Sequence, residues 1–419
     1  MRISGEGGSD PRAWCAAITL AFLALILFRI GTPASIYFDE LHYTKAARKL
    51  LTLNLANREH PLFAKEVIAA SIALFGDNST VWRVPSALFG TLGFYAFGRL
   101  MWLVSQRRAA TIFAMLLVAC NFSWFVQSRI AMLDIYAASL ALVGLWQFAA
   151  ALESGRPRLR LALSGIAIGL AMASKWSVVP LALLPGLTFF ALKLRRNDFP
   201  AIKRIGLAEA FAWLGLLPLA VYWLTFTPAF FYHDDPHRVG PLGFWAQHAR
   251  MIAMQDSVIK PHAYQSVWWQ WMLNLRPIWY LYENVDGAQR GVLMLGNPLT
   301  MLAGLPALVW CLWAALARKR RDALVMAVGY AAALGLWLVS GKPVQFYYHY
   351  LLPGVFLSGA LGLTLDQAWR KGGPWRGASL VMAAGSLAMF AWFWPILSAA
   401  PLAGGKGAFV EWMWLKSWR

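Results

Sequence analysis

The chain has 419 residues, of which 59% are hydrophobic and only 14% are charged, and apolar runs of about 20 residues recur along it. This composition excludes an ordinary soluble protein and predicts an integral membrane protein. The net charge of +19 comes from short basic clusters between the apolar runs, as the positive-inside rule describes. We expect no nucleic-acid partner, because no basic stripe with interleaved aromatic residues lies on a soluble face.

Eleven apolar stretches predict membrane-spanning helices, because backbone polar groups in lipid must be satisfied within the segment. They cover approximately residues 13–30, 82–104, 109–126, 131–151, 161–174, 176–192, 205–230, 292–316, 323–340, 344–366 and 377–398. The fifth and sixth stretches are short and could form one kinked span. Basic clusters at 156–160 and 193–196 favour a hairpin with its corner at Lys175, which places both clusters on one face. The first stretch could be a signal peptide, but its length and the many later spans favour an uncleaved anchor.

An odd number of spans places the two termini on opposite faces of the membrane. The short basic loops then share the face of Arg2 and Arg12, which we predict to be cytoplasmic. We expect one polytopic domain over residues 1–419, with a first outer loop at 31–81, a long outer loop at 231–291 and a C-terminal four-helix membrane part at 292–398. Most of the acidic residues and histidines fall on or near the outer face, so we expect the chemistry there.

Two stretches of the first outer loop have apolar residues at helical spacing, at 41–53 and 62–75. They predict short helices that lie on the bilayer surface. The tail contains Trp412, Trp414 and Trp418 beside a lysine, which is typical of an interfacial anchor.

The adjacent acids Asp39 and Glu40 directly follow the first span. Two carboxylates at the mouth of a span are costly unless water or a ligand meets them, so we predict a functional role for the pair. The alternative is that they cap the next helix. A carboxylate placed beside a lipid phosphate can deprotonate an acceptor hydroxyl.

The outer corners also contribute the cations Lys65, Arg129 and Lys175, which are suited to an anionic lipid headgroup. Other candidates for substrate contact are His60, Asp134, His262, Tyr264, Arg276, Tyr347 and His349. Structural alternatives stay open: an Arg129–Asp134 ion pair, a snorkelling Lys175, and packing roles for the two histidines at 60 and 349. No His or Cys spacing predicts a zinc site, and the three cysteines (Cys15, Cys120 and Cys311) lie in apolar stretches. A carboxylate-bound divalent cation remains open.

Several stretches resemble the protein O-mannosyltransferase family, in the order in which that family carries them. They are FDELHY (38–43), REHPLFAKEVIA (58–69), GDNSTVWRVPSALFGTL (76–92), SRIAMLDIYAASL (128–140), GIAIGLAMASKWS (165–177), HAYQSVWWQWMLNLRPIWYLYE (262–283), GNP (296–298) and FYYHYLLP (346–353). The chain departs from the family's His-Pro-Pro-Leu-Gly-Lys pattern at residues 60–65, which leaves the placement of Lys65 open.

The resemblance implies an all-α membrane glycosyltransferase of the GT-C fold in a bacterial plasma membrane. It implies inverting transfer of mannose, or a related hexose, from a polyprenyl-phosphate donor to Ser or Thr hydroxyls of a secreted protein, in membrane lipid and at the translocon. No cofactor is required by the resemblance. Asp39 would be the general base and Arg129 would hold the donor phosphate, with help from Lys175 or Lys65, while Glu40 would orient the acceptor or a cation.

Two rival functions remain. One is a related transferase that acts on lipid A or another envelope glycan. The other is a transporter or flippase, which the position of the acids outside the membrane, and not at its midplane, disfavours.

Overall fold

The computed structural model describes residues 9–55, 57–235, 238, 240–257 and 259–419. Arg2, which the sequence places on the cytoplasmic face, lies outside the described residues. The helices are, in chain order, α1 (Arg12–Leu27), α2 (Glu40–Leu50), α3 (Phe63–Phe75), α4 (Ser79–Ser105), α5 (Arg108–Ala119), α6 (Phe122–Gln127), α7 (Leu133–Glu153), α8 (Pro157–Ser174), α9 (Val179–Leu194), α10 (Pro200–Arg204), α11 (Leu207–Phe211), α12 (Leu217–Leu224), α13 (Phe244–Asp256), α14 (Trp268–Met272), α15 (Pro298–Ala317), α16 (Arg321–Val339), α17 (Leu351–Lys371) and α18 (Gly373–Phe393). The strands are β1 (Ile278–Val285) and β2 (Ala288–Met294).

Within the described part of the chain, eight helices are long and apolar enough to cross a membrane. Each of the eleven predicted spans contains at least one helix, but α1 and α5 are shorter apolar helices and α8 carries two arginines in its first turns. The chain is therefore an integral membrane protein, and the number of eleven spans stays a prediction. The fifth and sixth predicted spans are two helices, α8 and α9, that meet at Lys175.

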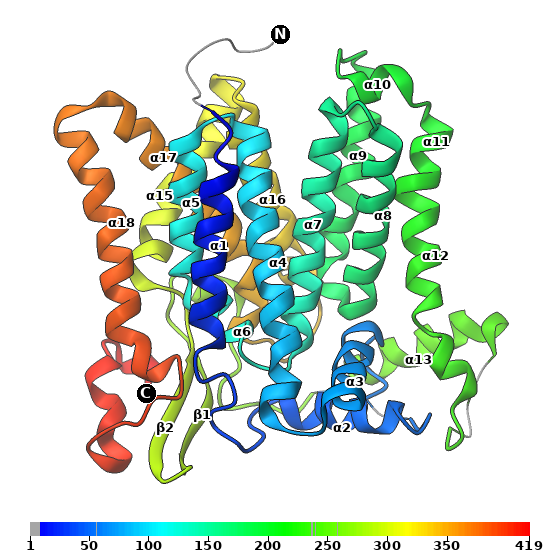
Figure 1. Cartoon of the computed structure of the whole chain (residues 1–419), viewed down its shortest axis with the longest axis vertical. Helices are drawn as coiled ribbons and strands as arrows, with labels where there is room; N and C mark the ends of the chain where they lie inside the picture. The colour runs from blue at the N-terminus through cyan, green and yellow to red at the C-terminus, as the bar shows by residue number, and fades with distance from the viewer. Residues whose placement is uncertain (1–8, 56, 236–237, 239, 258) are drawn as a thin grey trace.

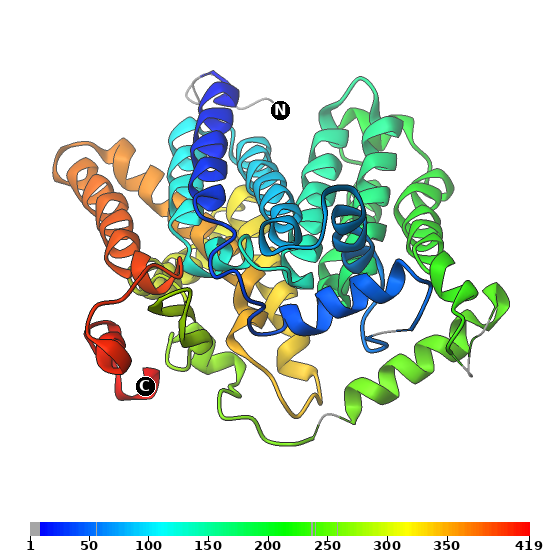
Figure 2. The same cartoon turned by 60° about the horizontal axis from the view of Figure 1, so that its bottom comes forward.

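The long helices run side by side, and the start of α1 and the C-terminus lie at opposite ends of the bundle (Figure 1). The segments α2, α3, α13 and the β-hairpin gather at the end that carries the C-terminus, whereas α10 lies at the other end (Figures 1 and 2). We call the first of these the outer end. The two helices predicted in the first outer loop are confirmed as α2 and α3.

The architecture is helical, as expected, and one β-hairpin is added to it at the outer end. Strands β1 and β2 pair antiparallel, with Asp286 and Gly287 at the turn, both with positive φ. Asp-Gly is a preferred pair for such a two-residue turn, since both positions need a left-handed backbone. The Asp286 carboxylate also accepts a hydrogen bond from the backbone N–H of Ala34 (2.8 Å), which ties the hairpin to the first outer loop.

Two of the three tail tryptophans are bound to the protein, and their role as an interfacial anchor stays a prediction. The indole of Trp412 donates to the Trp392 carbonyl and that of Trp418 donates to the Asn274 carbonyl, both at 2.8 Å. Both are buried, whereas Trp414 is about half exposed.

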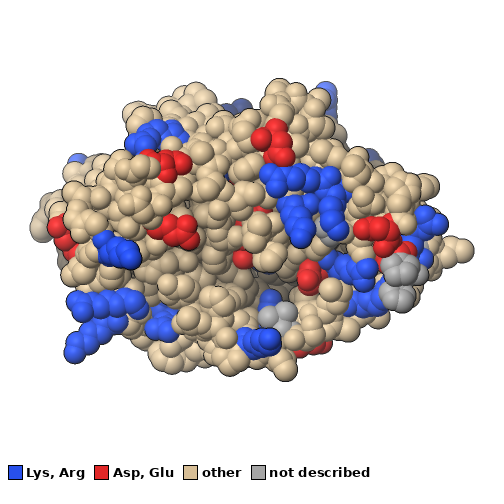
Figure 3. Space-filling view, turned by 90° about the horizontal axis from the view of Figure 1, so that it is seen from below, with Lys and Arg blue, Asp and Glu red and all other residues tan. Residues whose placement is uncertain are grey.

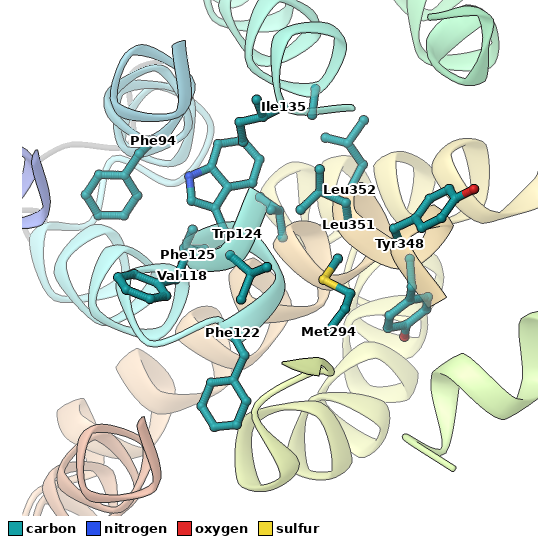
Figure 4. Close-up of a cluster of buried hydrophobic side chains, with 14 of the residues drawn as sticks. Phe94, Val118, Phe122, Trp124, Phe125, Ile135, Met294, Tyr348, Leu351 and Leu352 are labelled. Atoms are coloured by element: carbon teal, nitrogen blue, oxygen red, sulfur yellow. The ribbon is translucent and has the colours of Figure 1, made fainter. Parts of the chain in front are cut away.

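A buried aromatic cluster fixes the corner between the third and fourth predicted spans. Trp124 in α6 is fully buried, and its indole donates to the carbonyl of Gly90 in α4 (3.2 Å), among residues such as Phe94, Phe122 and Phe125 (Figure 4). Helix α7 packs closely on α4, because a Cβ at Gly93 would meet the Ser139 backbone at 2.6 Å. Small residues at such contacts let membrane helices approach. This packing sets the outer ends of α6 and α7, which carry Arg129 and Asp134.

Candidate functional site

Asp39 stands at the start of α2, but it does not cap that helix. Its side chain accepts no hydrogen bond from the first turn of α2. The preceding residue, Phe38, has a φ of +52°, a left-handed backbone that is costly for a bulky residue. The Phe38 ring stacks on Tyr280 of β1 at 3.9 Å between centroids, which holds this turn in place. The carboxyl of Asp39 is thus available to a ligand.

The electrostatic surroundings of Asp39 identify the other members of the site. Burial raises the pKa of the Asp39 carboxyl, and the charge of Asp134 raises it further. Lys175, His42 and His262 act in the opposite direction and lower the same pKa. A carboxylate with a raised pKa is a stronger base than an ordinary aspartate, so Asp39 is suited to accept a proton.

Lys175 and Asp134 form a buried ion pair beside Asp39. The Lys175 ammonium lies 2.8 Å from each carboxylate oxygen of Asp134, which is in the first turn of α7. It also lies 4.9 Å from the ring centroid of Tyr348. The backbone of Lys175 is extended at the end of α8, so its side chain points into the protein and does not snorkel. The alternative pairing of Asp134 with Arg129 is not formed.

Lys342, one of the cations that the sequence places in the outer corners, brings a second ammonium to this site. It lies in the corner between α16 and the 3-10 turn Tyr347–Tyr350. Burial and Lys175 lower the pKa of its ammonium, whereas Asp134 and Asp39 raise it. No described residue accepts a hydrogen bond from this ammonium. The sequence feature that marks Lys342 as a candidate is its position in an outer corner, directly before the tyrosines at 347, 348 and 350.

The long outer loop covers the same region with His262, Tyr264 and Arg276. The exposed His262 ring packs edge-on against Phe346 at 5.1 Å, and its Nδ1 accepts a hydrogen bond from the Tyr264 N–H (3.1 Å). The half-buried Arg276 donates to the Ala263 carbonyl at 2.8 Å. His262 is near enough to Asp39 to affect its pKa, so the loop contributes directly to the site.

The two other histidines predicted as candidates, His349 and His60, border different cavities. His349 is buried, stacks on Trp337 at 3.6 Å and accepts a hydrogen bond from the Phe346 N–H at 3.2 Å. It borders a cavity of about 20 Å³ together with Asp134 and Tyr348. His60 is half-buried near the ring of Tyr43 and lines a larger cavity of about 260 Å³.

Glu40, which the sequence predicts to be catalytic, is enclosed by the protein. Glu40 is fully buried, and its two oxygens accept hydrogen bonds from Arg83 at 2.8 and 2.9 Å. The backbone N–H of Ala131 donates a further bond at 3.1 Å. Glu40 therefore joins the first outer loop, α4 and the corner before α7, and positions the neighbouring Asp39.

Three further residues that were predicted to contact a ligand instead donate hydrogen bonds to other groups of the protein. Arg129 donates to the carbonyls of residues 26, 28 and 29 at the end of α1, so its geometry does not support the predicted phosphate contact. The Lys65 ammonium donates to the carbonyls of Asn57 and His60 at 2.8 and 2.7 Å, which shapes the first loop. Tyr347 is fully buried and donates to the Asn274 side chain at 2.6 Å.

The site is thus a cluster of opposite charges at the outer end of the bundle. Charged side chains of both signs surround a hollow on this face (Figure 3). No group of three or more His, Cys, Asp or Glu side chains in the described ranges could hold a metal ion. The arrangement combines an available carboxylate with two ammonium groups, which suits proton removal from an alcohol beside an anionic leaving group.

Comparisons with known proteins agree with this geometry. Two family models described as dolichyl-phosphate-mannose-protein mannosyltransferase match residues 16–82 and 59–223, and one described as the C-terminal four TMM region of protein-O-mannosyltransferase matches 242–418. A polyprenol-phosphate-mannose--protein mannosyltransferase of Mycobacterium tuberculosis is 25% identical, over 97% of this chain and 92% of the relative.

Two solved structures show the fold. The Saccharomyces cerevisiae Pmt1-Pmt2 complex bound to the sugar donor has a TM-score of 0.82 at 14% identity, over 99% of this chain and 93% of that chain. ArnT from Cupriavidus metallidurans bound to undecaprenyl phosphate has a TM-score of 0.60 at 17% identity, over 92% of this chain and 66% of that chain. The family models, which together match residues 16–223 and 242–418, show that the chain belongs to the protein O-mannosyltransferase family of membrane glycosyltransferases, and the solved structures show that it has the GT-C fold.

Proposed function

We propose that this protein transfers mannose, or a related hexose, from a polyprenyl-phosphate donor to Ser or Thr hydroxyls of secreted proteins. The observation that carries the proposal is the uncapped Asp39 carboxyl with a raised pKa beside Lys175. The names of the near-full-length relatives support this donor and a protein acceptor. A lipid A or envelope-glycan acceptor has weaker support, because the ArnT likeness is lower (TM-score 0.60) than the likeness to the mannosyltransferase complex (0.82).

In the proposed mechanism Asp39 takes the proton of the acceptor hydroxyl. The hydroxyl oxygen then attacks the anomeric carbon from the face opposite the phosphate, and the bond between that carbon and the phosphate oxygen breaks with its electron pair on the phosphate. One displacement of this kind inverts the anomeric centre. Lys342 and Lys175 stabilise the negative charge on the departing lipid phosphate, in place of the predicted Arg129 and Lys65. His262 and Arg276 border the acceptor side of the site.

We propose no cofactor requirement, since two ammonium groups already supply positive charge to the leaving phosphate. A divalent cation can be tested by adding a chelator to the assay. We also propose that the N-terminal end of α1 faces the cytoplasm of a bacterium and that the site faces outward across its plasma membrane. The basic short loops support this orientation. Secreted polypeptides would then reach the site as they leave the translocon, within membrane lipid.

The experiment that tests the proposal is transfer of radiolabelled mannose from synthetic polyprenyl-phosphate-mannose to a Thr-containing peptide. The purified wild type is compared with Asp39→Asn, and with Arg129→Ala as a variant outside the proposed chemistry. We expect transfer by the wild type and near-complete loss in Asp39→Asn. Absence of transfer by a folded wild type, with transfer instead to a lipid acceptor, would contradict the protein acceptor.

A further inference from the structure

A cavity of about 260 Å³ lies at the outer end of the bundle, apart from the Asp39 cluster. Its walls come from three segments: five residues of the first outer loop (Leu55, Asn57, Arg58, His60 and Leu62), the outer end of the seventh predicted span with the residues that follow it, and α13. Lining residues that bear on the argument are Asn57, His60, Tyr232, Met251, Ala253 and Met254. The mechanism proposed above does not use this cavity.

Specific contacts join the walls of the cavity and hold them in place relative to one another. The Gln255 side chain of α13 donates to the Glu59 carbonyl at 2.7 Å. Arg58 and Asp235 form an ion pair at 3.4 Å across one side. The backbone N–H of Leu55 donates to Asp234 at 2.6 Å. These contacts hold α13 at a fixed distance from the first outer loop.

One side chain links this cavity to the catalytic cluster. His60 lines the cavity, and it also interacts electrostatically with Lys175, Lys342 and His42, which surround Asp39. The His60 ring also lies 6.3 Å, between centroids, from the ring of Tyr43 in α2, the helix that begins directly after Asp39. Tyr232 also lines the cavity.

The size and lining of the cavity fit part of a polypeptide better than a lipid chain. A volume of about 260 Å³ is below the usual range of about 300–1,000 Å³ for a small-molecule pocket, and it is enough for one or two side chains. A polyprenyl chain belongs along the spans, where hydrocarbon surrounds it. The cavity instead lies at the outer end of the spans, where Phe226 borders it. It mixes apolar groups with the polar and charged side chains of Asn57, Arg58, Asp235, Gln247 and Arg250. Met251 and Met254 add flexible apolar side chains, which adapt to varied ligands.

We propose that this cavity receives an apolar side chain of the acceptor polypeptide, close in sequence to the Ser or Thr that accepts the sugar. The cavity then selects acceptors by the residue that flanks the hydroxyl. This inference rests on the proposed function for the identity of the acceptor. It assigns to α13 and the first outer loop a specificity role that is separate from proton removal and phosphate binding.

The test uses the full-length protein in detergent and a set of alanine-rich peptides with one Thr. A leucine is placed in turn at each position within three residues of the Thr, on either side. We expect leucine at one position to lower the acceptor KM about tenfold in the wild type, because burial of a leucine side chain supplies enough free energy for that factor. The KM for the donor stays unchanged across the peptides.

Two substitutions on α13 form a matched pair. Both residues are exposed, but only Ala253 lines the cavity. Ala253→Leu therefore enlarges a side chain at the cavity wall, and Ala249→Leu makes the same change on the same helix away from it. We expect the leucine preference to fall below about twofold in Ala253→Leu and to persist in Ala249→Leu. A preference that survives in Ala253→Leu, or a wild type without any preference, overturns the inference.

Peptide binding without turnover separates this inference from the proposed function. The same peptides, with Ala in place of Thr and with a fluorescent label, report affinity by anisotropy. A leucine preference in binding by the wild type, lost in Ala253→Leu, supports the cavity even if no mannose is transferred, a result that contradicts the proposed function alone. Transfer without a preference in either assay supports the proposed function and refutes the role of the cavity.

Discussion

Replacing Asp39 by Asn should slow sugar transfer by about two to four orders of magnitude, which corresponds to about 3–5 kcal/mol of activation free energy. No neighbouring carboxylate can substitute for it, because Asp134 binds Lys175 and Glu40 is fully buried. The free energy of unfolding should hardly change. Asp39 caps no helix, and burial raises its pKa, so the charged form of this side chain does not stabilise the fold.

The adjacent substitution Glu40→Gln should have the opposite effect: a large loss of unfolding free energy and a small loss of turnover. Both oxygens of Glu40 accept hydrogen bonds from Arg83, and neither side chain is exposed to solvent. Removing the negative charge leaves the guanidinium buried without a counter-charge. Breaking a buried pair in this way costs about 3–5 kcal/mol of unfolding free energy. The fraction of Glu40→Gln that stays folded should retain turnover within about tenfold of the wild type, because Glu40 only positions Asp39.

The assay measures both quantities on each purified variant: denaturant or thermal unfolding in detergent, and kcat per folded molecule. The double variant Glu40→Met with Arg83→Met is the control, since an apolar pair of similar volume can replace a buried ion pair. Its loss of stability should be smaller than the sum of the two single losses. The reasoning is refuted if Glu40→Gln unfolds like the wild type while its kcat collapses, or if Asp39→Asn keeps a wild-type kcat.

Three further outcomes follow from the charges and contacts around Asp39. Lys175→Met should move the acid limb of the kcat/KM profile to higher pH, because Lys175 lowers the pKa of the Asp39 carboxyl and the base must be deprotonated. A pH–rate profile whose acid limb does not move would contradict this prediction. Lys342→Gln should raise the donor KM about tenfold to a hundredfold, the value of a charge-assisted contact to phosphate, with little change in the acceptor KM. Phe38→Ala should lower kcat about tenfold through loss of the stack on Tyr280, and Phe38→Tyr should restore it; equal kcat in both variants would exclude this positioning role.

Local features of the fold could be predicted from the sequence because they depend on nearby residues. The helices α2 and α3 follow from apolar residues at helical spacing, and a hairpin at Lys175 follows from the basic clusters on either side. The β-hairpin carried a local signal as well, the Asp-Gly pair at residues 286–287. The hairpin lies mostly within the predicted long outer loop, for which no strands were predicted, and β2 continues into the start of the predicted span at 292–316.

The partners of charged residues could not be predicted in the same way. A sequence indicates that a buried charge needs compensation, but it does not say which residue supplies it. Glu40 pairs with Arg83, which is 43 residues away in sequence, and Asp134 pairs with Lys175, which is 41 residues away. Arg129 illustrates the difficulty best, since a cation near the end of a helix can bind either its last carbonyls or an external anion, and here it binds the carbonyls of α1.

The charge balance at the site explains why Lys342, rather than Arg129 or Lys65, is suited to the donor phosphate. Two carboxylates, Asp39 and Asp134, meet two ammonium groups, Lys175 and Lys342. Asp134 holds Lys175 through both oxygens, and this pair limits the rise of the Asp39 pKa. A phosphate that displaced Lys175 from Asp134 would leave a buried carboxylate uncompensated. It would also raise the Asp39 pKa further, so that the base would be protonated over more of the pH range. The Lys342 ammonium donates no hydrogen bond to a described residue, so it can neutralise an incoming phosphate. The Lys175–Asp134 pair meanwhile stays intact and keeps Asp39 ready to accept a proton.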